Sequence, residues 1–272
     1  MGLNMKETKG KGYALVTGAT GGLGKAFVYA LAARGDALIL TGRSEQKLQA
    51  LQAEITQKYP HVSTRIIPAD LANEGDRYAL MEQIRAWELS IGTLVNVAGA
   101  DIQKGLENYT QEKISFQCRV NFEAAVSLCH FAIKRRAERL EIINISSVSG
   151  IYPMPYFAVY SATKGALTSF SVSLREEMKK KNVAVTAILP GAMPTRVDVC
   201  QQIKGQGLWG RLAAKTPESV AECALRAVRK NKRKVVVGFW NKVMRFFTAF
   251  IPMPLKLRFI ARRWSKISKD AF

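Results

Sequence analysis

The chain has 272 residues, 48% of them hydrophobic, and a formal net charge of +20. These values predict a soluble globular protein with a sizeable core. Four cysteines without C-x-x-C spacing and only two histidines argue against a metal site and for a reducing compartment. The first residues contain no apolar segment, and no run of about 18 apolar residues occurs, so we expect neither a signal peptide nor a membrane-spanning helix.

Seven short apolar runs alternate with longer helical patterns along the chain. Such nearly continuous runs are typical of strands buried on both faces of a parallel sheet. The runs are Tyr13–Gly18, Ala37–Gly42, Ser63–Asp70, Thr93–Gly99, Glu141–Ser146, Val183–Pro190 and Lys234–Gly238. The pattern predicts one doubly wound α/β domain, a seven-stranded parallel sheet with helices on both faces. We expect an N-terminal segment at 1–10, this domain at 11–240 and a tail at 241–272.

Capping residues mark the ends of three predicted helices. The first ends at Gly35, which is suited to the position after a helix. The second begins after Ser44 as its N-cap and ends before Pro60. A helix near the end of the domain has Thr216 as its N-cap and Pro217 at its first position.

The turn after the first strand is rich in glycine. Ligands of doubly wound sheets bind outside the carboxyl ends of the strands. Glycines at this turn let the backbone approach a pyrophosphate, which the N-terminus of the next helix attracts. The spacing Gly18-x-x-x-Gly22-x-Gly24 differs from the common G-x-G-x-x-G. The candidate contacts are Thr17, Gly18, Thr20, Gly22, Leu23 and Gly24.

Arg43 follows the second strand, where NAD-binding sites usually carry an acid. An acid would repel the 2′-phosphate of NADP(H), whereas a guanidinium group can pair with it. The sequence therefore predicts NADP(H) rather than NAD(H). Lys25 and Ser44 are candidate helpers of Arg43.

The ends of the other strands supply further candidates at the same edge of the sheet. Asp70, with Leu71 beside it, is a candidate to receive the adenine amino group and equally a candidate N-cap of the next helix, and the two roles are compatible. The other candidates at this edge are Asn96, Ala98, Gly99, Ser146, Ser147, Pro190, Gly191 and Thr195.

Tyr160 and Lys164 are four residues apart in the segment YSATK, at a predicted helix start. This spacing places both side chains on one face of a helix. A nearby cation stabilises a phenolate and lowers the pKa of the phenol. Tyr160 is therefore a candidate proton donor to a carbonyl that receives a hydride, or a proton acceptor in the reverse reaction.

In their order and spacing, these motifs resemble the short-chain dehydrogenase/reductase family over about residues 11–240. The residues that carry the resemblance are Thr17, Gly18, Gly22, Gly24, Asn96, Ala98, Gly99, Ser147, Tyr160, Lys164, Pro190 and Gly191. Val97 is a departure, because the family's motif has a second asparagine there. The resemblance implies a Rossmann-type sheet and NAD(P)-dependent interconversion of a carbonyl and an alcohol.

The resemblance also implies roles for individual residues. Ser147 would hydrogen-bond the substrate oxygen, Tyr160 would transfer the proton, and Lys164 would bind the ribose and tune Tyr160. Asn121 would feed a proton relay through water, and Thr195 would hold the nicotinamide carboxamide. We also expect a homodimer or a homotetramer.

The resemblance implies that the segment after the sixth strand mainly determines which substrate is bound. Its apolar residues indicate a lid over an apolar pocket, although some of them would equally well pack on the core. They are Met193, Val197, Val199, Ile203, Leu208 and Trp209, with Gly205, Gly207 and Gly210 as hinges. Tyr152, Met154 and Phe157 would form a second apolar wall. We infer an apolar carbonyl or alcohol substrate that is lipid-like, steroid-like or aromatic.

The basic charge is concentrated near the end of the chain, where residues 226–272 contain fourteen Lys and Arg and one acid. Two apolar stripes with helical spacing lie in this region. The first comprises Val243, Phe246, Phe247 and Phe250, and Pro252 and Pro254 end it. The second comprises Leu257, Ile260, Ala261, Trp264 and Ile267, with Arg258, Arg262, Lys266 and Lys269 on another face.

The tail has two competing interpretations. Basic residues beside Phe and Trp suit a helix in an anionic membrane interface, as in a cytoplasmic protein attached peripherally to a membrane. Alternatively, the stripes pack on the sheet's flank, cover the substrate pocket or form an oligomer contact.

Two other classes of function were considered for the chain as a whole, and both are disfavoured. A dinucleotide-binding protein with a regulatory role remains an alternative, against which Asn121, Ser147, Tyr160 and Lys164 argue. Nucleic acid is not expected as the main partner, because no reading element is evident and the basic excess is terminal.

Overall fold

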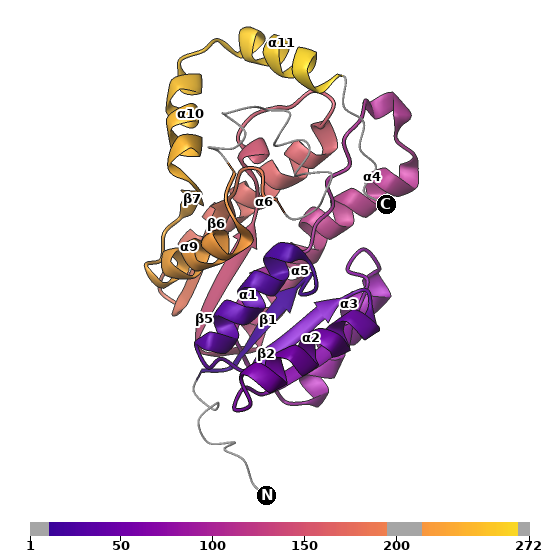
Figure 1. Ribbon diagram of the computed structural model, residues 1–272, viewed down its shortest axis with the longest axis vertical. Helices are drawn as coiled ribbons and strands as arrows, with labels where there is room; N and C mark the ends of the chain where they lie inside the picture. The colour runs from indigo at the N-terminus through magenta and orange to yellow at the C-terminus, as the bar shows by residue number, and fades with distance from the viewer. Residues whose placement is uncertain (1–10, 195–213, 266–272) are drawn as a thin grey trace, which may run out of the picture.

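The computed structural model describes residues 11–194 and 214–265. Within these residues the chain forms one parallel sheet in the strand order β3-β2-β1-β4-β5-β6-β7 (Figure 1). The strands are β1 Tyr13–Thr17, β2 Leu38–Gly42, β3 Thr64–Pro68, β4 Ile91–Asn96, β5 Arg136–Ile145, β6 Val183–Leu189 and β7 Lys234–Val236. The predicted seven-stranded parallel sheet is confirmed.

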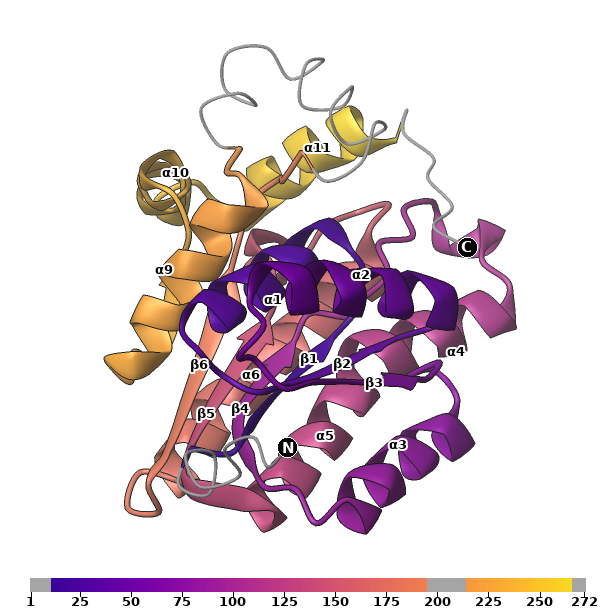
Figure 2. The ribbon, with the colours of Figure 1, turned by 60° about the horizontal axis from the view of Figure 1, so that its bottom comes forward.

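Helices cover both faces of the sheet, as predicted. One core cluster joins the strands to α1 Gly22–Ala33, α2 Glu45–Lys58 and α9 Pro217–Arg229. The other joins them to α3 Glu74–Ala86, α5 Ala124–Lys134 and α6 Ala158–Glu177. Figure 2 shows α1 and α2 above the strands and α3 and α5 below them. The short helix α4, Gln111–Cys118, continues through a π-helical turn, Arg119–Glu123, into α5.

The predicted caps form as expected. Ser44 Oγ accepts the main-chain N–H of Lys47 at 3.3 Å, at the start of α2. Thr216 Oγ1 accepts the N–H of Ser219 at 3.3 Å, at the start of α9. Gly35 follows α1 with φ = +79°, a left-handed conformation that glycine adopts without a Cβ penalty.

Strand β5 begins at Arg136 rather than at the predicted Glu141. Its first half carries exposed charged residues, so the sequence there is not an apolar run. The register between β4 and β5 also shifts between Ile91 and Thr93. Hydrogen bonding to the neighbouring strand, rather than burial, therefore extends β5 toward its amino end.

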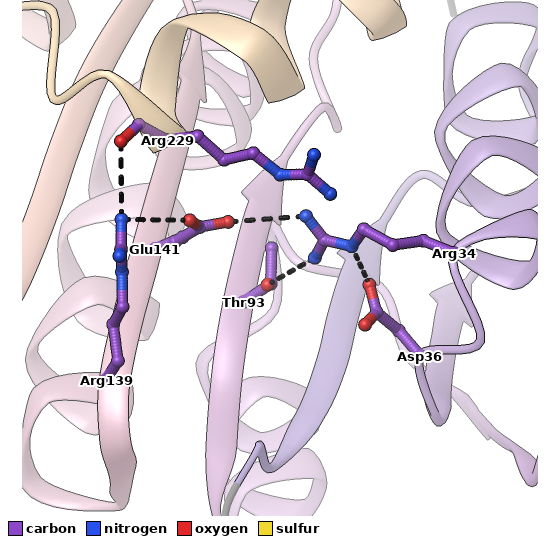
Figure 3. Close-up of polar contacts among 6 residues, drawn as sticks. All are labelled: Arg34, Asp36, Thr93, Arg139, Glu141 and Arg229. Atoms are coloured by element: carbon purple, nitrogen blue, oxygen red, sulfur yellow. Dashed lines mark hydrogen bonds and ion pairs between the residues drawn. The ribbon is translucent and has the colours of Figure 1, made fainter.

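A charged network ties the sheet to two helices on the side away from the carboxyl ends of the strands (Figure 3). The carboxylate of Glu141, which is buried in β5, lies 3.4 Å from Arg34 Nη1 and 3.3 Å from Arg139 Nη2. Arg34 also donates to Thr93 Oγ1 at 3.2 Å and pairs with Asp36. Arg139 donates to the carbonyl oxygen of Arg229 at 3.4 Å. Because two guanidinium groups compensate the buried carboxylate, the network holds the ends of α1 and α9 against β4 and β5.

Two helices extend beyond the last strand. They are α10 Phe239–Ala249 and α11 Met253–Trp264, and both lie near the carboxyl edge of the sheet, at an angle to each other (Figure 1). No helix among the described residues is long and apolar enough to span a bilayer.

Candidate active site

A cavity of about 1300 Å³ lies at the carboxyl ends of the strands. Sixteen of the predicted site residues line it: Gly18, Thr20, Gly22, Leu23, Gly24, Arg43, Asp70, Leu71, Ala98, Gly99, Ser146, Ser147, Tyr160, Lys164, Pro190 and Gly191. Thr17, Asn96 and Asn121 are buried close by without lining it. Thr195 and most of the predicted lid, at 195–213, lie outside the described residues.

The glycine-rich turn brings the start of α1 against the end of β1. Gly18 has φ = +59°, and a Cβ on Gly24 would lie 2.0 Å from the carbonyl oxygen of Gly18. Only glycine at position 24 allows this approach. No side chain caps the N-terminus of α1, and its first turn contains no acid. The positive end of the helix dipole therefore faces the cavity without a competing anion, which suits a phosphate.

Thr17 holds two strands together at the edge of the cavity. Its Oγ1 accepts the main-chain N–H groups of Val97 at 2.9 Å and Ala98 at 3.0 Å. It also donates to the carbonyl oxygen of Val95 at 3.3 Å. Through these bonds Thr17, which does not itself line the cavity, holds the end of β1 against the segment that follows β4.

Arg43 is exposed at the rim of the cavity, directly after β2. Among the described residues its guanidinium group pairs with no carboxylate. The two predicted helpers are engaged elsewhere: Ser44 caps α2, and Lys25 lies 3.7 Å from Glu54 and does not line the cavity. Of the three predicted contacts to the 2′-phosphate, only Arg43 is therefore available to bind it.

Asp70 lines the cavity next to Leu71. Its Oδ1 accepts the N–H of Ala72 at 3.0 Å, and its own N–H donates to Asp76 Oδ2 at 2.8 Å. The prediction that Asp70 caps α3 is wrong, because Asn73 is the N-cap and accepts the N–H groups of residues 75 and 76. The turn at Asp70 instead presents it and Leu71 to the cavity.

Asn96 belongs to a buried polar network under the site. Its amide donates to Asn144 Oδ1 at 2.8 Å, and Asn144 donates to Ser171 Oγ at 2.9 Å. Cys129 lies in the same network, 3.7 Å from Asn144 Oδ1, and its burial raises the pKa of the thiol to about 12. The network joins β4 and β5 to α5 and α6, the elements that position the candidate catalytic groups.

Ser147 follows β5 and lines the cavity. Its Oγ accepts both the N–H of Ser149, at 3.1 Å, and the hydroxyl group of Ser149, at 2.7 Å. Because both bonds use Ser147 as the acceptor, its own hydroxyl hydrogen remains to be donated. Ser147 is thereby prepared to donate to an oxygen atom in the cavity.

Tyr160 is in the first turn of α6, and its ring is stacked on Phe157 with the ring centroids 4.3 Å apart. Phe157 immediately precedes the helix, so this stacking restricts the direction of the phenol. Lys164, one turn further along, lines the same cavity. The structure thus brings together the pair expected from the spacing YSATK.

Lys164 is almost completely buried. Its Nζ donates to the carbonyl oxygen of Ile145 at 2.8 Å and lies 5.7 Å from the centroid of the Tyr160 ring. Burial lowers the pKa of Lys164 to about 8, against the smaller opposing effect of the Asp101 carboxylate. The ammonium group is therefore still largely charged at neutral pH.

Asn121 lies in the π-helical turn between α4 and α5. Its amide pairs with both main-chain groups of Ala100: Oδ1 accepts the N–H at 2.7 Å and Nδ2 donates to the carbonyl oxygen at 2.9 Å. It also donates to Thr163 Oγ1 at 3.1 Å. The side chain of Asn121 therefore joins the segment after β4 to α6 without lining the cavity.

The tail contributes a large part of the cavity wall. A Cβ on Gly191 would lie 2.7 Å from Asn241 Nδ2, so the loop after β6 packs closely on α10. Tyr152 hydrogen-bonds Thr248 Oγ1 at 2.7 Å, and Trp264 stacks on Phe157 with centroids 6.2 Å apart. The predicted second wall thus lines the cavity together with α10 and α11. Of the predicted stripes, only Ile260 and Trp264 are among the described residues that line it.

Several polar residues of the lining were not expected from the sequence. Two of them, Asp101 and Gln103, follow β4, and the others are Ser149, Asn241, Arg245, Thr248, Lys256 and Arg263. Gln103 is buried, and within 11–194 and 214–265 its Nε2 has no hydrogen-bond partner. The segment after Gly99 has no periodic pattern that would have indicated Asp101 and Gln103.

Comparisons with known proteins agree with this geometry. The family model described as "short chain dehydrogenase" matches residues 12–203. The chain belongs to the short-chain dehydrogenase family. The family and the enzyme class expected from the sequence are thereby confirmed: the chain is an NAD(P)-dependent short-chain dehydrogenase/reductase that acts on CH–OH and C=O groups.

Individual relatives carry different names. The bovine very-long-chain 3-oxoacyl-CoA reductase is 33% identical over 231 residues, which cover 81% of this chain and 70% of that protein. The human inactive hydroxysteroid dehydrogenase-like protein 1 is 30% identical over 245 residues, or 88% of this chain and 72% of that protein. Some matches, such as the duck reductase, cover only 61% of the relative's own length.

Solved structures share the fold. The structure of a 7β-hydroxysteroid dehydrogenase has a TM-score of 0.80 and 26% identity, covering 93% of this chain and 98% of that one. The short-chain dehydrogenase from Sphingobium yanoikuyae, solved in complex with NADPH, has a TM-score of 0.71 and 24% identity, covering 89% and 96%. Structural neighbours of this short-chain dehydrogenase therefore include proteins that bind NADPH.

Proposed function

We propose that this short-chain dehydrogenase uses NADP(H) to interconvert a ketone and an alcohol on a bulky apolar substrate, with Tyr160 as the proton donor or acceptor. The observation that carries the proposal is that Ser147, Tyr160 and Lys164 line one cavity together with the glycine-rich turn and Arg43. A hydroxyl donor, a phenol and an ammonium group thus meet beside a phosphate-binding turn, which is what carbonyl reduction by a dinucleotide requires.

The described residues fit an NADP(H) molecule. The uncapped start of α1 suits the pyrophosphate, and the close contact of Gly24 with Gly18 keeps that turn tight. Arg43 suits the 2′-phosphate, because it has no carboxylate partner among the described residues and the position after β2 carries no acid. Asp70 and Leu71 would hold the adenine, and Pro190 and Gly191 would contact the nicotinamide end; all four line the cavity. Bound NADPH supplies the hydride that reduces the carbonyl carbon.

Side chains of the protein orient the substrate oxygen and transfer its proton. Ser147 donates its remaining hydroxyl hydrogen to that oxygen and so orients the carbonyl group. Tyr160 donates its phenolic proton as the oxygen becomes an alcohol, and the charge on Lys164 favours the phenolate that is left. In oxidation, the phenolate accepts the proton back. Asn121 keeps α6 in place relative to the segment after β4, so it supports this geometry indirectly.

The substrate end of the cavity is mainly apolar. Phe116, Val120, Met154, Phe157, Met193, Met244, Ile260 and Trp264 line it. A long acyl chain, a steroid or an aromatic ketone would each fit such a surface, and relatives are named as 3-oxoacyl-CoA reductases and as hydroxysteroid dehydrogenase-like proteins. The buried donor of Gln103 would pair with a second oxygen of the substrate, beyond the reacting carbonyl.

A panel of carbonyl compounds tests this proposal, with the loss of NADPH absorbance as the readout. The panel contains a long-chain 3-oxoacyl thioester, a steroid ketone, an aromatic ketone and a small polar ketone. We expect NADPH oxidation with at least one of the three bulky apolar substrates and none with the small polar ketone. The Tyr160→Phe variant is the matched control, because it keeps the ring and the fold but lacks the proton donor.

A second candidate function is dinucleotide binding without turnover. It is considered because the human relative is named as inactive. The intact set Ser147, Tyr160 and Lys164 in one cavity favours catalysis instead. NADPH binding without oxidation of any bulky carbonyl would support this second function.

Assembly and location remain predictions. We propose a homodimer or a homotetramer in the cytoplasm. Light scattering after size-exclusion chromatography measures the oligomeric state directly.

A further inference from the structure

Three of the four residues of the first predicted stripe are exposed, as is Phe239 at the start of α10, whereas Val243 is partly buried. Phe239, Phe246, Phe247 and Phe250, which we call the phenylalanine face of α10, are between 62% and 74% exposed. Three of the rings contact one another edge to face, with Phe246 at 5.6 Å from Phe247 and 5.2 Å from Phe250 between centroids. Met253 is also exposed, whereas the exposed side chains of Ile251, Leu255 and Phe259 line the cavity. A contiguous apolar surface of this kind indicates an interaction site.

The cavity lies on the opposite side of the same helix. The residues of α10 that line it are Trp240, Asn241, Met244, Arg245 and Thr248. Successive residues of a helix turn by about 100°, so this set and the phenylalanine face point in nearly opposite directions. The packing of α10 on the domain is therefore complete without the phenylalanine face. In the first predicted stripe Val243 is partly buried, but Phe246, Phe247 and Phe250 are exposed and do not pack on the domain. Leu257, Ile260, Ala261 and Trp264 of the second stripe are partly buried, as the packing alternative required, and Ile267 lies outside the described residues.

The segment that carries the phenylalanine face is basic. Residues 239–265 contain six basic residues and no acid. Arg245, Lys256 and Arg263 line the cavity, whereas Lys242, Arg258 and Arg262 are exposed and do not line it. Aromatic side chains that project from a basic helical surface match an interface with anionic lipids, where the rings enter the headgroup region and the cations remain at the charged surface.

We propose that α10 docks this protein on an anionic bilayer through the phenylalanine face. The partner is a lipid surface rather than a second copy of the chain, because pairing two copies through this face would bring two sets of basic residues together with no acid to neutralise them. In the ribbon views α10 and α11 lie at the outside of the molecule (Figure 1, Figure 2).

Docking has a consequence for the cavity. Since one side of α10 lines the cavity and the other contacts lipid, a membrane-bound molecule keeps the cavity within one helix diameter, about 10 Å, of the bilayer surface. An apolar substrate dissolved in the bilayer would then reach the site without crossing bulk water. The docking itself does not depend on the proposed reaction, and its measurement needs neither cofactor nor substrate.

Flotation of the full chain with vesicles tests the proposal. One set of vesicles contains phosphatidylcholine alone, and the other also contains phosphatidylserine. The parent protein should float with the anionic vesicles at low ionic strength, and high ionic strength should weaken the binding by screening. In the double variant Phe246→Ser/Phe250→Ser, the partition coefficient should fall at least about tenfold. Neither residue lines the cavity, and both are exposed, so the fold should persist.

Matched variants separate the phenylalanine face from general effects. Tyr78→Ser/Leu106→Ser removes two comparably exposed apolar side chains, 59% and 57% exposed, away from the tail, and should bind vesicles like the parent. Arg258→Gln/Arg262→Gln should lower the partition coefficient about tenfold on anionic vesicles only.

Three results would each overturn the proposal. One is the absence of parent protein from floated anionic vesicles, and another is unchanged flotation of the double phenylalanine variant. The third is a dimer in solution that this variant dissociates, because a second copy would then cover the phenylalanine face.

Discussion

The ammonium nitrogen of Lys164 lies 5.7 Å from the centroid of the Tyr160 ring, one turn further along α6. The same nitrogen donates to the carbonyl oxygen of Ile145 at 2.8 Å, at the end of β5. Lys164 therefore joins the helix that carries the phenol to the strand that leads to Ser147. This arrangement makes the charge of one buried lysine relevant to both the position and the chemistry of Tyr160.

The hydroxyl group of Tyr160 should be essential for turnover. Tyr160→Phe keeps the stacking on Phe157 and removes only the proton donor. We expect turnover to fall on the order of 10²–10⁴-fold, with NADPH affinity nearly unchanged. Ser147→Ala should also lower turnover, since it removes the donor to the reacting oxygen. Steady-state kinetics with the best substrate of the panel measures both effects, and a Tyr160→Phe enzyme as fast as the parent would contradict the mechanism.

Arg43 should distinguish the two nicotinamide dinucleotides. Arg43→Ala removes a guanidinium group that has no carboxylate partner among the described residues, so the domain should be as stable as before. NADPH binding should weaken by about 1.5–3 kcal/mol, the range for a hydrogen bond to a charged group, whereas NADH binding should change little. Titration calorimetry with both cofactors checks this. Lys25→Ala is the control, because Lys25 pairs with Glu54 and does not line the cavity. If Arg43→Ala weakened the binding of NADPH and NADH equally, Arg43 would not contact the 2′-phosphate.

The stability of the cofactor-free protein should reveal the low pKa of Lys164. Burial lowers this pKa from 10.5 to about 8. Below about pH 8 the folded protein carries a buried charge, and this destabilising contribution disappears as the pH rises toward 10.5, where the unfolded chain also loses its proton. The free energy of unfolding of the parent relative to Lys164→Met should therefore rise by about 1.4 kcal/mol per pH unit over this interval.

Urea denaturation of both proteins at several pH values from 7 to about 10 measures that difference. Comparing the two proteins at each pH cancels the contributions of the other titrating groups. A difference that stays constant with pH would mean that Lys164 has the same pKa in the folded and unfolded chains.

Gln103 should contribute to substrate binding at the expense of stability. Its Nε2 is a buried donor without a partner in the part of the chain that the structure describes, and this costs about 1–3 kcal/mol. Gln103→Leu should therefore raise the free energy of unfolding or leave it unchanged. At the same time it should raise KM several-fold for a substrate with a second oxygen, with little change in kcat.

Gln117→Leu is the control for this prediction. Gln117 is also buried, but its amide donates to the carbonyl oxygen of Ala100 at 3.1 Å. Its loss leaves that oxygen with one partner fewer and should destabilise the protein. Thermal melts and substrate titrations of the two variants should thus shift in opposite directions, and equal destabilisation of both would show that Gln103 is satisfied in the protein.

The sequence alone determined the features that depend on local physics. Nearly continuous apolar runs predict strands that are covered on both faces, and the parallel sheet follows from the helices between them. Ser44 and Thr216 act as N-caps because a hydroxyl group one residue before a helix reaches N–H groups that have no partner within the helix. Tyr160 and Lys164 meet because helical geometry places residues four apart on one face. The family followed from the same motifs.

Only the tertiary structure decided features that depend on distant neighbours. Asn73, rather than Asp70, caps α3, because the turn after β3 places Asp70 toward the cavity. Thr17 and Asn121 bind main-chain groups that lie 21 or more residues away in the sequence. No local pattern therefore shows that they support the cavity without lining it.

The two stripes of the tail show the same limit. Both have the spacing of an amphipathic helix, yet α11 turns its stripe toward the domain and α10 turns its stripe outward. Periodicity identifies an apolar face but not what the face contacts. That depends on how the chain leaves the sheet at Gly238, whose φ of +93° sets the direction of α10.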